Sequence, residues 1–211
     1  MSLLVVGSLA LDTVETPFGS VHDALGGSAT YISTVASYFL TPIRMVGVVG
    51  GDFPKSAIDF LESRHVDMEG LQIVKDKKTF RWGGRYQYDL NARDTLFTEL
   101  NVFEEFNPVI PESYKSSTYV CLGNIDPVLQ RRVVEQLDKP RLIVGDTMNF
   151  WIERKYDELM KTMELLDILI VNESEARLLA EEPNLVRSAR KILKMGPKAL
   201  IKKESIDAKN K

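Results

Sequence analysis

Short apolar runs, each ending abruptly in a glycine, an aspartate, an asparagine or a basic residue, recur along this 211-residue sequence. Within a run, apolar residues follow one another directly, which is typical of strands buried on both faces of a parallel sheet. Segments with helical features separate the runs, so the alternation predicts a doubly wound α/β fold. The runs are Leu3–Val6, Arg44–Val49, Tyr119–Leu122, Arg141–Val144, Asp167–Val171 and Ala199–Ile201.

The segments between the runs carry start and stop signals for helices. Ser28 is a capping residue at the start of the first segment, and Pro42 follows closely after its end. Pro54 occupies a position that the first turn of a helix accepts. The expected helices span residues 29–40, 55–64, 127–137, 155–165, 174–180 and 184–195.

The stretch Thr79–Leu90 differs from the rest because aromatic and polar residues alternate along it. A period of two predicts a strand with one exposed face. Gly83 and Gly84 inside it indicate a bulge or the close approach of another group to the backbone. Several aromatic side chains on a half-exposed strand suit a lid over a ligand or an interface.

Charge and cysteine content exclude several classes of protein. The formal net charge of -3 indicates no broad electrostatic footprint for nucleic acid or an anionic membrane. The single cysteine, Cys121, excludes an internal disulfide framework and indicates a reducing, cytoplasmic compartment. No apolar run reaches the roughly 20 residues that span a bilayer, and the N-terminus lacks the basic region of a signal peptide.

The residues that directly follow the apolar runs are the first candidates for ligand binding, because ligands of open α/β sheets bind outside the carboxyl ends of the strands. Carboxylates and amides accept hydrogen bonds from several hydroxyls, which suits a polyol or sugar. Each of these residues by itself also fits an ordinary turn. They are Gly7, Ser8, Asp12, Gly50, Gly51, Asp52, Gly123, Asn124, Asp146, Thr147, Asn149, Asn172, Glu173 and Glu175.

Other fingerprints are weak or absent. The pair Gly26-Gly27 at a helix start fits an anion- or hydroxyl-binding turn and fits a plain tight turn equally well. The sequence contains neither a P-loop lysine pattern nor GxGxxG, which argues against a Rossmann dehydrogenase. His22 and His65 have no metal-ligating companion at a useful spacing, so no histidine metal site is expected.

In their order, the motifs resemble those of the ribokinase-like family of carbohydrate kinases, also called the PfkB family, over residues 3–203. The resemblance implies one α/β domain over residues 1–211, with a doubly wound, mostly parallel sheet that is incomplete at the C-terminus. It also implies a small β lid, with elements at about 13–25 and 78–106. The stretches that carry it are Val5–Asp12, Leu25–Thr30, Val46–Phe53, Phe80–Phe106, Asp146–Asn149 and Asn172–Glu175.

The resemblance implies ATP-dependent phosphorylation of a hydroxyl group on a sugar or related small polyol, with ATP and Mg²⁺ as cofactors. The substrate-binding residues implied are Asp12, Gly26, Gly27 and Asn149. On the nucleotide and phosphate side they are Asn172 and Glu175, and Glu175 also serves Mg²⁺.

Three departures from the family pattern qualify this expectation. Tyr31 stands where many sugar kinases have asparagine, so a nucleoside substrate stays open, and Pro54 replaces a frequent glycine. The family's Gly-Ala-Gly-Asp anion hole and its catalytic aspartate do not occur in these 211 residues, so no catalytic residue is assigned. We therefore expect this chain alone to be impaired as a kinase.

The alternative to an enzyme is a catalytically inactive kinase fragment that binds a small molecule or associates with itself. A sheet without its later strands exposes an edge and an apolar face, which predicts a homodimer. The stretch from Glu204 onward is polar and has no core pattern.

Overall fold

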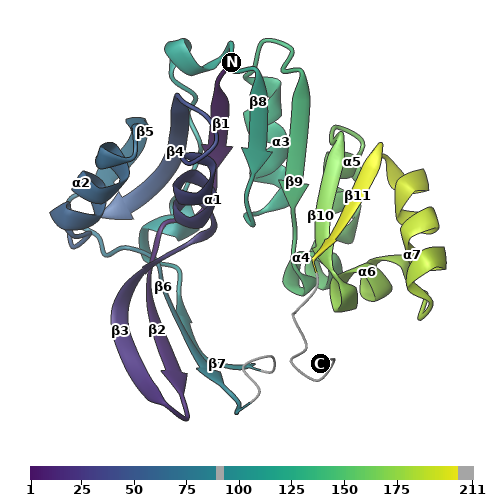
Figure 1. Ribbon diagram of the computed structural model, residues 1–211, viewed down its shortest axis with the longest axis horizontal. Helices are drawn as coiled ribbons and strands as arrows, with labels where there is room; N and C mark the ends of the chain where they lie inside the picture. Colours follow the sequence, from purple (N-terminus) through teal and green to yellow (C-terminus); the bar gives the residue numbers. More distant parts are fainter. Residues whose placement is uncertain (89–92, 204–211) are drawn as a thin grey trace.

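The computed structural model describes residues 1–88 and 93–203, and its centre is a parallel sheet of seven strands in the order β11-β10-β9-β8-β1-β4-β5 (Figure 1). All pairs of neighbouring strands in this main sheet run parallel. The strands are β1 (Leu3–Val6), β4 (Ile43–Gly50), β5 (Val66–Val74), β8 (Tyr119–Leu122), β9 (Leu142–Asp146), β10 (Ile168–Asn172) and β11 (Ala199–Lys203).

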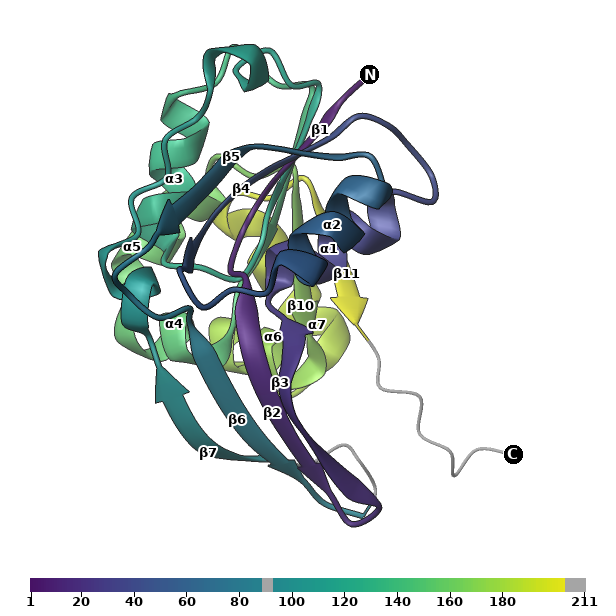
Figure 2. The same ribbon diagram turned by 90° about the vertical axis from the view of Figure 1, so that its left-hand side faces the viewer.

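Helices cover the two faces of the main sheet, as Figure 2 shows for α1 and α2 on one side and α3 and α5 on the other. Alternation along β1 explains the two layers, because Leu4 and Val6 belong to one buried cluster and Val5 to the other. The helices are α1 (Ser28–Ala36), α2 (Lys55–Ser63), α3 (Pro127–Glu135), α4 (Asn149–Arg154), α5 (Tyr156–Met163), α6 (Glu173–Ala180) and α7 (Leu185–Ile192). The doubly wound α/β fold predicted from the sequence is confirmed.

A second, smaller sheet of four strands in the order β3-β2-β6-β7 lies beyond the carboxyl ends of β1 and β4, and we call it the lid (Figure 1). Strands β2 and β6 run parallel, while the outer pairs are antiparallel. The lid strands are β2 (Ala10–Thr16), β3 (Gly19–Gly26), β6 (Arg81–Tyr86) and β7 (Arg93–Glu99). After β7 the chain leaves the lid through a 3-10 helix, Asn101–Glu105.

The two glycines of β6 make room for aromatic rings on opposite faces of the lid. A Cβ at Gly83 would lie 2.4 Å from the ring of Phe97, and one at Gly84 would lie 2.0 Å from the ring of Trp82. The register between β6 and β7 also shifts between these glycines. The bulge and the close approach expected from the sequence are therefore both present. The expected strand Thr79–Leu90 is shorter, and residues 89 and 90 lie outside the described ones.

The structure corrects the predicted N-terminal cap of helix α1. Gly27, rather than Ser28, is the N-cap of α1, and no side chain caps that end. Ser28 is the first helical residue, and its hydroxyl binds Ser8 instead. The expected helix 155–165 is also preceded by a separate short helix, α4, which has no apolar repeat long enough to detect.

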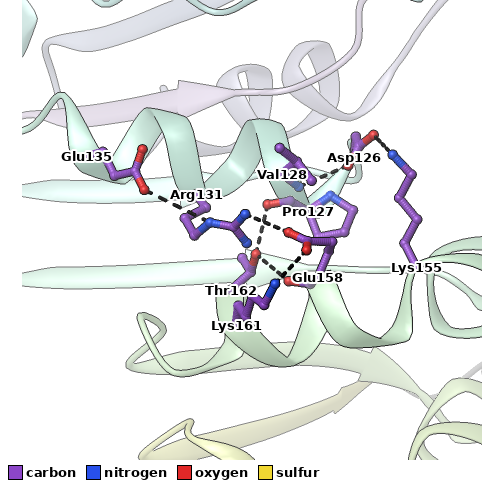
Figure 3. Close-up of polar contacts among 9 residues, drawn as sticks. All are labelled: Asp126, Pro127, Val128, Arg131, Glu135, Lys155, Glu158, Lys161 and Thr162. Carbon is purple, nitrogen blue, oxygen red and sulfur yellow. Dashed lines mark hydrogen bonds and ion pairs between the residues drawn. The ribbon is translucent and has the colours of Figure 1, made fainter.

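A polar network joins α3 to the connection between α4 and α5 (Figure 3). Asp126 caps α3 by accepting from the Val128 amide at 2.9 Å, and its other oxygen pairs with Lys155 at 2.5 Å. Lys155 lies between α4 and α5, so this pair fixes the end of α4 against α3. Hydrogen bonds from Lys161 and Arg131 lower the pKa of Glu158 to about 2.

One face of strands β8 to β10 is only half-buried. Leu169 and Val171 of β10 are buried against the helices behind them, whereas Ile168 and Ile170, which point the other way, are not. Val144 of β9 continues this half-buried face, because it pairs with Ile168. Among the described residues, the helices on this side are α1 and α2, and they cover β1, β4 and β5.

The polar stretch from Glu204 onward lies outside the described residues. Within residues 1–88 and 93–203, the structure contains no helix with both the length and the apolar character needed to cross a membrane.

Candidate functional site

Asp12 lies on β2, where the lid meets the main sheet. It pairs with Ala24 of β3 and with Trp82 of β6, so it occupies the middle of the lid sheet. Its Oδ1 atom is buried, and no group in the described part of the chain donates a hydrogen bond to it. Burial raises the pKa of Asp12 to about 6. A buried, unpartnered carboxylate oxygen is costly, and a ligand hydroxyl would satisfy it.

Each glycine of the pair at the end of β3 is required by a different neighbour. A Cβ at Gly26 would lie 2.0 Å from Asp12 Oδ2. Gly27 has φ 94°, in the region that favours glycine, and a Cβ there would lie 2.3 Å from the Ser8 carbonyl oxygen. Asp12, Gly26 and Gly27, which sequence reasoning assigned to substrate binding, are therefore brought together.

Ser8 and Ser28 tie the start of α1 to the end of β1. The Ser28 amide donates to Ser8 Oγ at 3.1 Å, and the Ala29 amide donates to the Ser8 carbonyl at 3.0 Å. These two amides at the helix start are therefore already satisfied within the protein. Gly7 and Gly123 leave space for Ser28, because a Cβ at either would lie 2.5 Å from Ser28 Oγ. No sequence spacing indicated this serine pair, since its members are 20 residues apart.

Several aromatic side chains lie on the same side of the lid as Asp12 or near it. Trp82, and Tyr86 further along β6, share a lid face with Asp12 by strand alternation. Tyr31 of α1 is 61% exposed, and its pKa is raised by burial of its hydroxyl and by the negative charges of Asp12 and Tyr86 nearby. Arg93 of β7 lies over the Trp82 ring, with its guanidinium carbon 5.4 Å from the ring centroid. The sequence indicated an aromatic strand but not which of its faces would meet Asp12.

Gln130 connects the ends of two central strands and was missed from the sequence. Its Nε2 donates to the carbonyls of Gly123, after β8, and Asp146, at the end of β9, both at 2.9 Å. The side chain is nearly fully buried on α3. A glutamine inside a helix carries no distinctive signal, so only the structure reveals that it spaces these strand ends.

Asn149 is the first residue of α4 and is exposed. In the described part of the chain no hydrogen bond links it to Asp12 or to Asn172. Its neighbour in the same helix, Trp151, donates from Nε1 to Asn124 Oδ1 at 2.9 Å. The structure therefore places Asn149 at a strand-end turn, as expected, without joining it to either group of site residues.

Asn172 and Glu175 form a capping box at the start of α6. The Glu175 amide donates to Asn172 Oδ1, and the Asn172 amide donates to Glu175 Oε2, both at 2.8 Å. Burial raises the pKa of Glu175, and the neighbouring charge of Asp146 adds to this effect. Lys203, at the end of β11, pairs with Asp146 at 2.9 Å. The asparagine and glutamate three residues apart, noted in the sequence, thus cap helix α6, in addition to any role they have in ligand binding.

The carboxylates of Glu175 and Asp146 suit a cation that is also bound by phosphate groups and water. Within the described ranges, no group of three or more histidine, cysteine, aspartate or glutamate side chains gathers closely enough to hold a metal ion alone. Mg²⁺ in kinases is usually bound by one or two carboxylates together with substrate phosphates and water. Glu175 and Asp146, whose like charges disfavour each other, fit that partial role.

Comparison with known proteins agrees with this architecture. A curated relative, the cytidine kinase of Thermococcus kodakarensis, is 26% identical over 205 residues, which are 95% of this chain and 72% of the relative. A PfkB protein from Polaromonas sp. JS666 matches 96% of this chain and 76% of its own, with a TM-score of 0.78 and 13% identity.

A third match shows a related protein with ligands. An E. coli protein described as a putative ribokinase II in complex with ATP and Mg²⁺ matches 95% of this chain and 72% of its own, with a TM-score of 0.74 and 18% identity. The sequence pattern of the pfkB family carbohydrate kinases matches residues 2–206, nearly the whole chain. Taken with the seven-stranded sheet, the lid and the strand-end turns, this match shows that the chain belongs to the pfkB family of carbohydrate kinases.

Proposed function

We propose that this chain forms the substrate-binding part of an ATP-dependent kinase that phosphorylates a hydroxyl group of a sugar or nucleoside. The observation that carries the proposal is the buried Asp12 carboxylate, whose Oδ1 lacks a hydrogen-bond donor within the described residues. An ionised carboxylate accepts hydrogen bonds but donates none, so its natural partner is a pair of substrate hydroxyls. Gly26 leaves room for this carboxylate itself, because a Cβ there would lie 2.0 Å from Asp12 Oδ2.

The aromatic side chains near Asp12 favour a nucleoside over a free sugar as the substrate. Tyr31, Trp82 and Tyr86 offer flat rings near the carboxylate, and an aromatic base stacks on such rings. The curated relative from Thermococcus kodakarensis is described as a cytidine kinase, which supports the same choice.

Asn172, Glu175 and Asp146 form the proposed phosphate side. When bound, Mg²⁺ would neutralise phosphate charge, and Glu175 with Asp146 would hold it directly or through water. Asn172 anchors Glu175 through the capping box and keeps its carboxylate at the carboxyl end of β10. Asn149, at the start of α4, is proposed as a further substrate contact.

We also propose that these 211 residues alone bind substrate without efficient turnover. The sequence contains no Gly-Ala-Gly-Asp motif, which the family resemblance assigns to the anion hole and the general base. General-base help is typically worth about 100- to 10,000-fold in rate.

The test combines binding and turnover. Isothermal calorimetry with cytidine, inosine, adenosine, ribose and fructose should show binding of at least one compound, and Asp12→Asn should abolish that binding. A coupled ADP-release assay with ATP and Mg²⁺ should then show little turnover by this chain. Failure of the whole panel to bind would overturn the first proposal, and turnover clearly above background would overturn the second.

We also propose that the chain forms a homodimer and that it is located in the cytoplasm. The half-buried apolar face formed by Val144, Ile168 and Ile170 supports a homodimer, because pairing two such faces would remove them from water. Cys121 supports a reducing compartment, since it is the single cysteine of the sequence and has no partner for an internal disulfide.

A further inference from the structure

Arg81 joins the lid to the main domain through two carboxylates. It lies on β6, and its guanidinium pairs with Asp23 of β3 and with Asp52 in the turn after β4. The distance from Arg81 NH2 to Asp52 Oδ2 is 3.1 Å. Only 24% of the Arg81 side chain is exposed, so these charge-assisted bonds are stronger than ion pairs on an open surface.

Asp52 is itself held firmly on the main domain. Its Oδ1 accepts from the Thr79 amide at 2.7 Å and from the Thr79 hydroxyl at 2.8 Å. The Gly50 amide, at the end of β4, donates in turn to Thr79 Oγ1 at 3.0 Å. An unbroken series of hydrogen bonds therefore runs from β4 to the lid strand β3.

The register of the lid connects Arg81 to the substrate site. Leu11 pairs with Arg81, and the next pair along the strands is Asp12 with Trp82. Because side chains alternate between faces, Arg81 and Asp12 lie on opposite faces of the same two strands. A displacement of Arg81 would therefore displace the backbone that carries Asp12.

Leu11 and Leu25 of the lid pack against the apolar cluster of the main domain, but this packing is incomplete beside α2. A cavity of about 300 Å³ separates the lid from the start of α2. Lid residues and main-domain residues line it from opposite sides: Leu11, Asp23 and Leu25 from the lid, and Pro54, Ser56, Ala57 and Phe60 from the main domain. The Arg81–Asp52 ion pair crosses this boundary, and the Arg81–Asp23 pair extends the connection within the lid to β3.

We propose that Arg81 is a positioning residue that clamps lid strand β3 to Asp52 and so holds Asp12 in place at the substrate site. Its effect on substrate binding rests on the function proposed above, whereas its effect on the lid does not. Arg81 touches no candidate substrate group itself, because it lies on the other lid face.

The chain offers a matched control on the same strand. Arg85 of β6 pairs with Glu15 of β2 at 2.8 Å, so both partners of this ion pair belong to the lid. Arg85→Gln removes an arginine–carboxylate pair from the lid without removing any contact to the main domain. Differences between Arg81→Gln and Arg85→Gln thus isolate the clamp.

The experiment measures amide hydrogen exchange by mass spectrometry on the full 211-residue chain without ligand. Arg81→Gln should speed exchange in lid residues 10–26 about tenfold or more, as expected when a local opening loses roughly 1.4 kcal/mol. The main-sheet strands should keep their protection, Arg85→Gln should resemble the wild type, and Arg81→Lys should recover part of the protection. Asp23→Asn serves as a second variant, since it breaks the clamp from the lid side.

Calorimetry with cytidine as the probe separates this inference from the proposed function. Arg81→Gln should weaken cytidine binding and Arg81→Lys should restore part of it, while Arg85→Gln should not change it. If cytidine and the other probes fail to bind the wild type, the proposed function fails, but the exchange result still decides the clamp. Unchanged lid exchange in Arg81→Gln and Asp23→Asn overturns the inference, as does global unfolding of both variants when Arg85→Gln stays folded.

Discussion

The Asp12 carboxylate occupies the space that a side chain at position 26 would need, since a Cβ on Gly26 would lie 2.0 Å from Asp12 Oδ2. These two residues lie on neighbouring lid strands, β2 and β3, and the carboxylate lies across the glycine. The position of the Asp12 carboxylate and the backbone at Gly26 are thus coupled, because a displacement of either residue would displace the other.

Gly26→Ala should displace Asp12 and destabilise the protein by about 1–3 kcal/mol, the usual cost of forcing extra volume into a packed site. Urea unfolding measures this loss. In an Asp12→Ala background the same Gly26→Ala change should cost much less, because the clashing carboxylate is gone. Equal costs in the two backgrounds would contradict the coupling.

Asp12→Asn should change how stability depends on pH. Burial raises the pKa of Asp12 from 3.8 to about 6, so the folded wild type holds this proton more tightly than the unfolded chain does. The free energy of unfolding should therefore fall as pH rises from about 4 to about 6, by roughly 1 kcal/mol given that the carboxylate is only partly buried. Thermal melts across this range should show the decline in the wild type and a flatter profile in Asp12→Asn.

Gln130→Met should destabilise the protein by about 1–3 kcal/mol, because it leaves the carbonyls of Gly123 and Asp146 without their shared donor. Chemical denaturation measures the loss. Gln87→Met is the matched control, since the Gln87 side chain is exposed and donates to Asp94 at the surface of the lid. Comparable losses in the two variants would argue against a special role for Gln130.

Glu175→Gln and Asn172→Ala should separate stability from nucleotide binding. Asn172→Ala removes the side-chain cap of α6 and should cost about 1 kcal/mol of stability. Glu175→Gln keeps an oxygen that can accept from the Asn172 amide, so stability should hold or rise, because the buried charge is removed. Calorimetry with ATP and Mg²⁺ should nevertheless show weaker binding by Glu175→Gln. Unaltered binding would remove Glu175 from the phosphate side.

Ile168→Glu should shift the protein toward monomer if the half-buried face of β9 and β10 forms a homodimer. The charge would sit in the middle of the interface and could not be desolvated without cost. Leu178→Glu is the control, because Leu178 is exposed on α6 on the other side of the sheet. Sedimentation at micromolar concentration measures the shift, and a wild-type monomer would refute the dimer.

The sequence allowed six of the seven main-sheet strands to be predicted, whereas the edge strand β5 was missed because Val66–Val74 mixes exposed polar residues with apolar ones. Strands buried on both faces are apolar at nearly every position, so Leu3–Val6 and most of Ile43–Gly50 are recognisable without any partner. The lid strand β2 was not found this way, because Ala10–Thr16 is exposed in part and mixes apolar with polar residues. Helix α4 was missed because six residues are too few for a repeat.

The local sequence pattern also led to a wrong prediction for the polar residue at the start of α1. Ser28 has the chemistry of a helix cap, yet Gly27 takes that position and Ser28 turns to Ser8, because the two strand-end glycines nearby leave room for its hydroxyl. Asn172 and Glu175, by contrast, form the local bonds that their spacing favours. A capping box involves neighbours three residues apart, so it needs no knowledge of the tertiary structure.

The sequence by itself determined the parallel main sheet, its glycine and acidic turns and the family to which they point, because each of these follows from short-range pattern and order. Only the tertiary structure decided that Asp12 is buried without a donor, that Trp82 and Tyr86 face it, and that Arg81 bridges Asp23 and Asp52 behind it. Those relationships depend on strand register, and a shift of one residue would reverse which side chains meet.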